Sequence, residues 1–166
     1  FSNTRYISQE AHRELCRRCR PGIGDILLTK IGTTGVAVRV DESREFSIFV
    51  SLALLKFSQA NLDGKYLEAL LNSPFVRQQS AAGTQGIGNK NLVLRLIRDL
   101  RLPIPPLAEQ RRIVERIDQL MSLIDQLAAQ TDRARMAAAD LTDGMVRGLR
   151  TPGPEPSRLA AEGDDC

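Results

Sequence analysis

Apolar side chains recur every three or four residues over the last third of this 166-residue chain. The steps alternate between four and three, and Thr131 is the only polar member of the series. The series comprises Ile113, Ile117, Leu120, Ile124, Leu127, Thr131, Ala134, Ala138, Leu141 and Met145. This heptad spacing is typical of a coiled coil, because it places one apolar stripe along one side of a helix.

The same segment predicts a single long helix. From Leu107 to about Arg147 it would be roughly 60 Å long at 1.5 Å per residue. Glu109 would lie in the first turn, where the helix dipole favours a negative charge. Residues 1–106 could cover the stripe, but so small a domain cannot cover all of it. We therefore predict that a partner helix packs on Ile113, Ile117, Leu120, Ile124, Leu127, Ala134, Ala138 and Leu141.

The first half of the chain has the pattern of a small mixed domain. β-branched and apolar runs separated by glycines and polar residues predict strands at 25–29, 36–40 and 46–50. The first two would be joined by a short loop, Gly32-Thr33-Thr34-Gly35, in which glycine can take positive φ. Helical spacing predicts a short amphipathic helix within residues 5–20 and helical structure over 62–80, interrupted at Pro74.

A polar loop over residues 82–90 and alternating apolar residues over 91–102 complete the first half, which ends abruptly at Pro103, Pro105 and Pro106. The predicted fold class is therefore α+β. We expect a small mixed α/β domain over residues 1–106 and a long coiled-coil helix over 107–148. A Pro/Gly-rich, then acidic, disordered tail would follow over 149–166.

Charge is unevenly distributed between the two halves. Residues 1–106 carry 15 Lys and Arg against 9 Asp and Glu, whereas the remainder is acidic. Such a surplus favours a polyanionic partner, because Lys and Arg release condensed counterions from phosphates. Apolar runs are too short for a membrane span, which needs roughly 18 residues.

Cysteine and histidine are too few for a metal or disulfide framework. The cysteines are Cys16, Cys19 and Cys166, and an odd count with one on a polar tail favours reduced thiols in the cytoplasm. His12, Cys16 and Cys19 could hold part of a zinc site, but a second ligand pair is missing. We expect no metal.

No catalytic constellation is evident. His12 is the only histidine available as a general base, and neither a P-loop nor a dinucleotide-binding glycine motif occurs. Asn72-Ser73-Pro74-Phe75 is similar to the Asn-Pro-Pro-Phe loop of amino-methyltransferases, but its middle proline is replaced, so it is interpreted as a helix end. The sequence predicts a non-catalytic protein without cofactors.

Three motifs are similar to those of a known family. They are Gly24-Asp25-Ile26-Leu27, Gly32-Thr33-Thr34-Gly35 and Leu102-Pro103-Ile104-Pro105-Pro106-Leu107-Ala108-Glu109-Gln110-Arg111-Arg112-Ile113-Val114. With these motifs the chain resembles the specificity subunits of type I restriction-modification systems. The last is similar to the family signature that joins a target recognition domain to a long conserved helix. The resemblance extends from about Tyr6 to about Leu127.

The resemblance implies a function and a set of partners. A full subunit of that family carries two target recognition domains, each reading half of a split target in double-stranded DNA, joined by two antiparallel helices. Two modification (methyltransferase) subunits supply S-adenosylmethionine chemistry, and restriction subunits add ATP-driven cleavage. This chain would supply one recognition domain, truncated at its N-terminus, and would need a second recognition domain or a second copy of itself to pair with its helix.

Residues for DNA contact are expected in two loops. Lys30, Thr33, Thr34 and Arg39 flank the first predicted hairpin, and Thr84, Gln85, Asn89 and Lys90 lie in the second loop. Amide side chains suit adenine, whereas Lys and Arg suit guanine or phosphate. The competing hypothesis is a coiled-coil dimerisation protein that no longer binds DNA. A methyltransferase is disfavoured by the missing cofactor site.

Overall fold

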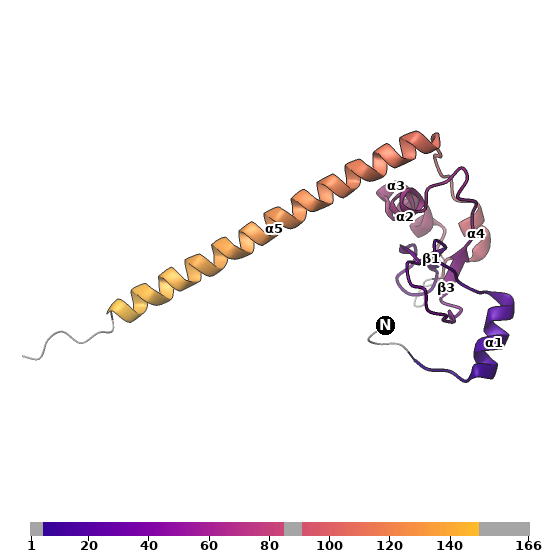
Figure 1. The fold of residues 1–166 in the computed structure, drawn as a ribbon, viewed down its shortest axis with the longest axis horizontal. Coiled ribbons are helices and arrows are strands. Elements are labelled where there is room, and N and C mark those ends of the chain that lie inside the picture. The colour runs from indigo at the N-terminus through magenta and orange to yellow at the C-terminus, as the bar shows by residue number, and fades with distance from the viewer. Residues whose placement is uncertain (1–4, 85–90, 150–166) are drawn as a thin grey trace, which may run out of the picture. The chain divides into compact units, whose positions relative to one another are not determined.

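The computed structural model describes residues 5–84 and 91–149 and has an α+β fold, as predicted (Figure 1). The chain forms two compact units, Phe1–Asp118 and Gln119–Cys166. The first holds a small sheet with helices, and the second holds most of a long helix. The predicted tail lies outside the described residues, apart from Leu149. No helix in the described part is both long enough and apolar enough to cross a membrane.

The sheet has three antiparallel strands in the order β2-β1-β3. They are β1 (Ile26–Thr29), β2 (Ala37–Arg39) and β3 (Leu52–Leu55). The positions of β1 and β2 agree with the predicted runs. The prediction of the third strand at 46–50 is wrong, because β3 comprises Leu52–Leu55. Phe49 and Val50 are 73% and 62% exposed. The strand lies further along because small Ala53 pairs opposite Leu28 and is buried in the core.

The short helices begin at polar caps. Ser8 accepts the N–H of Ala11 at 3.2 Å and starts α1 (Gln9–Arg18). Asp63 accepts two N–H groups at the start of α2 (Gly64–Asn72). Ser73 ends α2 and caps α3 (Pro74–Ala82), in which Pro74 takes the first position. The helix end predicted here is confirmed, and the proline starts the next helix. The remaining short helix is α4 (Leu94–Arg98).

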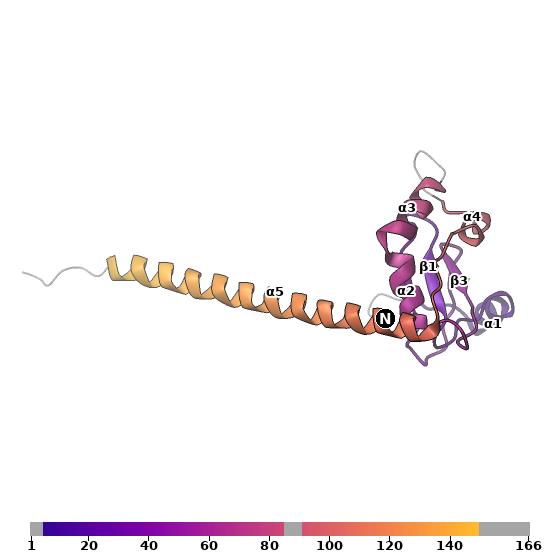
Figure 2. The same ribbon diagram turned by 90° about the horizontal axis from the view of Figure 1, so that it is seen from above.

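The core lies between one face of the sheet and α2, which Figure 2 shows beside β1. Ile26 and Leu28 of β1 are almost completely buried, and Leu67 and Leu71 of α2 pack in the same cluster. Burying such side chains stabilises the fold by about 1.5–3 kcal/mol each. The core thereby fixes the β1–β2 hairpin against α2.

Side chains of α2 close the free edge of β2. The Asn72 amide accepts the N–H of Ala37 at 3.0 Å and donates to the carbonyl of Ala37 at 2.8 Å. Glu68 accepts the N–H of Arg39 at 3.1 Å. An edge strand otherwise presents unpaired backbone groups to other chains. Side chains of α2 therefore bind backbone groups of β2 that a neighbouring strand would otherwise bind.

Replacing Asn72 by Ala is expected to lower the free energy of unfolding by about 1–3 kcal/mol, because two backbone groups of a half-buried edge lose their partner. Urea denaturation followed by circular dichroism measures the loss. Asn72→Asp, which keeps the acceptor but not the donor, should be destabilising too. If both variants unfold at the wild-type urea concentration, the edge contact contributes nothing.

The long helix is α5 (Leu107–Leu149), 43 residues, and it begins at the predicted residue. Its first turns, through Asp118, belong to the compact unit Phe1–Asp118. Ile113 and Val114 pack against the core. Ile113, predicted to pair with a partner helix, therefore contacts its own domain. The first turns of α5 pack against the core of the domain. Heptad spacing alone does not distinguish this contact from contact with a partner helix.

Beyond those turns the heptad side chains are exposed. Every residue from 115 to 147 is exposed, and Leu120, Ile124, Leu127 and Leu141 are between 44% and 70% accessible. Exposed apolar surface of this extent on a helix is typical of an interaction face. The helix is confirmed, and its partner stays a prediction.

Candidate nucleic-acid interface

The loop between β1 and β2 is held in one conformation by its own backbone and by Thr29. The hydroxyl of Thr29 donates to the carbonyl of Thr33 and accepts the N–H of Val36 at 3.0 Å. Gly32 and Gly35 both have φ of +81°, as the short loop required. A Cβ on Gly35 would lie 3.0 Å from the Cβ of Ser80, so this loop also packs closely on α3.

The structure brings the two predicted DNA-contact loops together. The hydroxyls of Thr34 and Thr84 are 3.3 Å apart. On the other side of the second loop, the N–H of Leu92 donates to the carbonyl of Lys30 at 2.7 Å, and Ile31 forms a β-bridge with Asn91. Both described flanks of the second loop therefore lie at the tip of the β1–β2 hairpin. Gln85, Asn89 and Lys90 lie outside the described residues.

We call Lys30, Thr33, Thr34 and Thr84 the hairpin-tip cluster. Thr33 is exposed and the other three are half-buried. Hydroxyls can donate to or accept from base edges and phosphates, and a lysine can bind guanine or phosphate. The hydroxyl of Thr84 already donates to the carbonyl of Ser80 at 2.6 Å, so the donors that the cluster offers to a nucleic acid are those of Lys30 and the exposed Thr33.

Arg39 does not belong to this cluster. It pairs with Ile26 at the far end of the hairpin from its tip. The four residue steps from Ile26 to Lys30 span about 13 Å at 3.3 Å per step. Sequence proximity placed Arg39 beside the loop, but the direction of β2 carries it away from the tip.

His12 and Cys16 near the N-terminus make polar contacts with neighbouring side chains. His12 Nδ1 is 2.8 Å from the hydroxyl of Ser47, and the Cys16 sulfur is 3.6 Å from His12 Nε2. Desolvation by burial raises the pKa of the Cys19 thiol. In the part of the chain that the structure describes, no three His, Cys, Asp or Glu residues are grouped so that they could bind a metal.

Sequence reasoning missed the role of Gln110, although the motif that contains it was noticed. This side chain is fully buried at the start of α5. Its amide donates to the carbonyls of Asn61 and Pro105 at 3.0 and 2.7 Å and accepts the N–H of Asp63 at 2.8 Å. Gln110 therefore joins the first turn of α5 to the segment that starts α2.

Two further contacts fix the proline-rich segment before α5. The hydroxyl of Tyr66 donates to the carbonyl of Pro103 at 2.8 Å. The Gln79 amide exchanges two hydrogen bonds with the backbone of Arg101, at 2.9 and 3.1 Å. The segment is thus bound to both α2 and α3, so the domain that carries the hairpin-tip cluster also holds the beginning of α5.

Glu109 lies in the first turn of α5, as predicted. Two hydrogen bonds of 2.8 Å from Arg112, together with its charge, lower the pKa of the Glu109 carboxyl. Because the folded pKa is lowered, this interaction contributes stability above the unfolded pKa and is lost as pH falls through the folded value. Arg112→Gln should return the pKa toward its usual range, which an NMR titration of the carboxyl carbon measures. An unchanged titration would contradict the pairing.

Comparison with known proteins shows which family has similar sequences. The family described as type I restriction modification DNA specificity domain matches residues 13–133. The specificity subunit of the type I restriction enzyme EcoBI of Escherichia coli is 25% identical over 146 residues, which cover 88% of this chain and 31% of that protein.

Two further relatives from Escherichia coli are specificity subunits of the same type. The EcoEI subunit is 24% identical over 130 residues, covering 74% of this chain and 22% of the relative. The EcoAI subunit is 38% identical over 71 residues, covering 42% and 12%. The chain spans less than a third of the length of each relative.

Proposed function

The chain belongs to the family of type I restriction modification DNA specificity domains, and on that premise we propose that it reads one half of a two-part DNA target. The hairpin-tip cluster and the loop 85–90 would contact base edges in the major groove. The observation that carries this proposal is the junction of the two loops, made by Thr34 with Thr84 and by Lys30 with Leu92.

The proposal assigns separate roles to the two parts of the chain. Residues 1–106 form the recognition domain, and α5 pairs with a second helix, from another recognition domain or from a second copy. Methyltransferase and restriction subunits in the cytoplasm supply the chemistry, and this chain has no catalysis or cofactor of its own. The contacts of Gln110, Tyr66 and Gln79 support a fixed junction between the domain and the start of α5.

Filter binding of duplex DNA to the chain tests the proposal, with and without its methyltransferase subunit. We expect binding that weakens steeply with salt, as phosphate contacts require, and that tightens when the methyltransferase subunit is added. Replacing Lys30 and Lys90 by Ala should weaken it. Arg17→Ala, which removes a cation from an exposed ion pair on α1, is the matched control.

A chain that retains no DNA even beside its methyltransferase subunit would contradict the proposal. If that chain still associates through α5, the coiled-coil dimerisation protein becomes the better account. Equal weakening by the loop variant and the Arg17 variant would show that the hairpin tip has no specific part in binding.

A further inference from the structure

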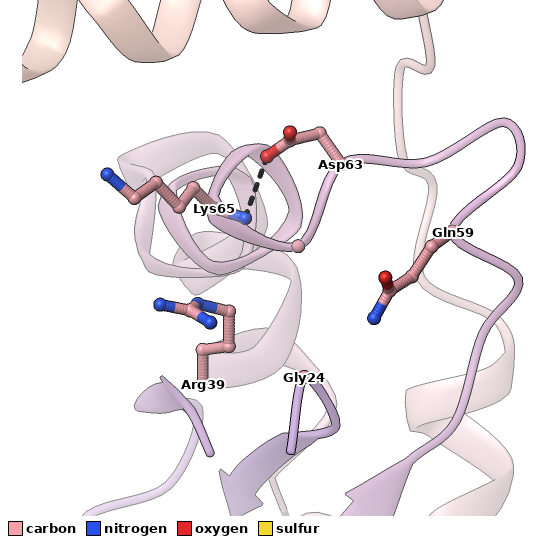
Figure 3. Close-up of a pocket in the computed structure, with 6 residues that line it drawn as sticks. Gly24, Arg39, Gln59, Asp63 and Lys65 are labelled. Carbon is pink, nitrogen blue, oxygen red and sulfur yellow. Dashed lines mark hydrogen bonds between the residues drawn. The ribbon is translucent and has the colours of Figure 1, made fainter. Parts of the chain in front are cut away.

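A hollow of about 270 Å³ lies next to the first turn of α2, on the side of the domain where Arg39 leaves β2 (Figure 3). It is lined by Gly24, Arg39, Gln59, Asp63, Gly64 and Lys65, all within the compact unit Phe1–Asp118. Figure 3 shows Arg39 extending toward the first turn of α2, with Gly24 and Gln59 across the hollow. Arg39, Gln59 and Lys65 contribute hydrogen-bond donors.

Two glycines keep this hollow open. A Cβ on Gly64 would lie 3.1 Å from Cδ of Arg39 and 3.5 Å from the ring of Phe57. A Cβ on Gly24 would lie 2.5 Å from Nε2 of Gln59, and its φ of +87° also disfavours any other residue. The side chains of Arg39 and Gln59 therefore lie close to backbone that carries no Cβ.

Arg39 lacks a hydrogen-bond acceptor at a buried position. Its Nε is buried, with no hydrogen-bond partner among the residues that the structure describes. A buried charged donor without an acceptor is costly, and a guanidinium binds phosphate oxygens through two parallel hydrogen bonds. The unpaired Nε of the Arg39 guanidinium therefore favours the binding of an anion in the hollow that this side chain lines.

The other charges at the hollow permit an anion. Lys65 forms an ion pair with Asp118 at 3.2 Å, but both side chains are more than half exposed, so the pair is weak. The carboxylate of Asp63 accepts the N–H groups of Lys65 and Tyr66, where the positive end of the helix dipole offsets its charge. Among the side chains that line the hollow, two are cations and one is a carboxylate, whereas the carboxylates of Asp118 and Glu68 lie outside the lining and bind Lys65 and the backbone N–H of Arg39.

We propose that this hollow binds a backbone phosphate of the DNA whose bases the hairpin tip reads, which rests on the proposed function. The hairpin tip lies about 13 Å from the Arg39 end of the sheet, and the major groove of B-DNA is about 12 Å wide. A tip in the groove thus leaves Arg39 within reach of the phosphates along its wall. Arg39 fixes the position of the duplex, and the tip reads it.

The test is the salt dependence of duplex binding by the full chain with its methyltransferase subunit, between roughly 50 and 200 mM KCl. Arg39→Gln should weaken binding about tenfold and reduce the slope of log K against log salt by about 0.9, the value for one phosphate. Arg39→Lys keeps the charge but loses Nε, so it should keep the slope and still weaken binding. Arg17→Gln is the control for general loss of positive charge.

The outcomes separate this proposal from the function on which it rests. If wild-type chain binds no DNA, the proposed function fails and the phosphate site fails with it. If wild-type chain binds and Arg39→Gln matches Arg17→Gln in affinity and slope, the phosphate site alone is overturned. Thermal unfolding of each variant shows whether the domain is intact. We expect it to be, because Nε of Arg39 makes no internal hydrogen bond that the substitution would break.

Discussion

Replacing Gln110 by Ala is expected to lower the free energy of unfolding by about 3 kcal/mol or more, a large share of the 5–15 kcal/mol typical of a domain. The substitution leaves the carbonyls of Asn61 and Pro105 and the N–H of Asp63 without their partner, in a partly buried site around the fully buried Gln110 side chain. Urea denaturation measures the loss. Hydrogen exchange should also show faster opening of the first turns of α5, because these contacts hold them to the domain.

Gln126→Ala is the matched control, since Gln126 is an exposed residue of the same helix and its loss should change stability by less than about 0.5 kcal/mol. Gln110→Glu has nearly the same size but places a carboxylate against two carbonyls. It should destabilise the domain at neutral pH and less so in acid, where the protonated carboxyl regains a donor. Gln110→Ala as stable as Gln126→Ala would contradict the role of this side chain.

The second large effect is expected on the exposed face of α5. Replacing Leu120, Ile124 and Leu127 by Asp should weaken helix pairing at least hundredfold. Each buried apolar side chain contributes about 1.5–3 kcal/mol, and 1.4 kcal/mol is a factor of ten. Sedimentation of the chain, alone and with its methyltransferase subunit, measures the association.

Ala129→Asp is the control for this second prediction, because Ala129 is exposed on α5 and is not a member of the heptad series. The control should pair like the wild type. A wild-type chain that stays monomeric with every candidate partner would contradict the pairing face. So would equal loss of pairing in the triple variant and the control.

The elements that could be predicted from the sequence are those whose signal is local and repeated. The heptad series fixed α5 to the correct first residue because the prolines before it and the stripe after it agree. The third strand was misplaced because Phe46, Phe49 and Val50 have the composition of a strand. Strand position depends on the pairing partner, and β1 pairs with Leu52–Leu55.

The candidate site was predictable in part, for the same reason. Gly32 and Gly35 predicted the hairpin loop. No local sequence pattern indicates that Thr84, fifty residues after Thr34, contacts it. The polar contacts of Gln110 join residues 47 and 49 positions apart, so no periodicity reveals them. The register of β2 places Arg39 at the end of the hairpin opposite the loop, and its distance from the loop in the sequence does not reveal this.

Selection from a pool of random-sequence duplexes measures whether the hairpin tip reads DNA sequence. The chain, with its methyltransferase subunit, should enrich one short sequence half. A variant with Thr33, Thr84 and Lys90 replaced by Ala should lose that preference while keeping salt-sensitive binding. Recovery of an unenriched pool by the wild-type complex, or of the same sequence by both proteins, would show that the hairpin tip does not read DNA sequence.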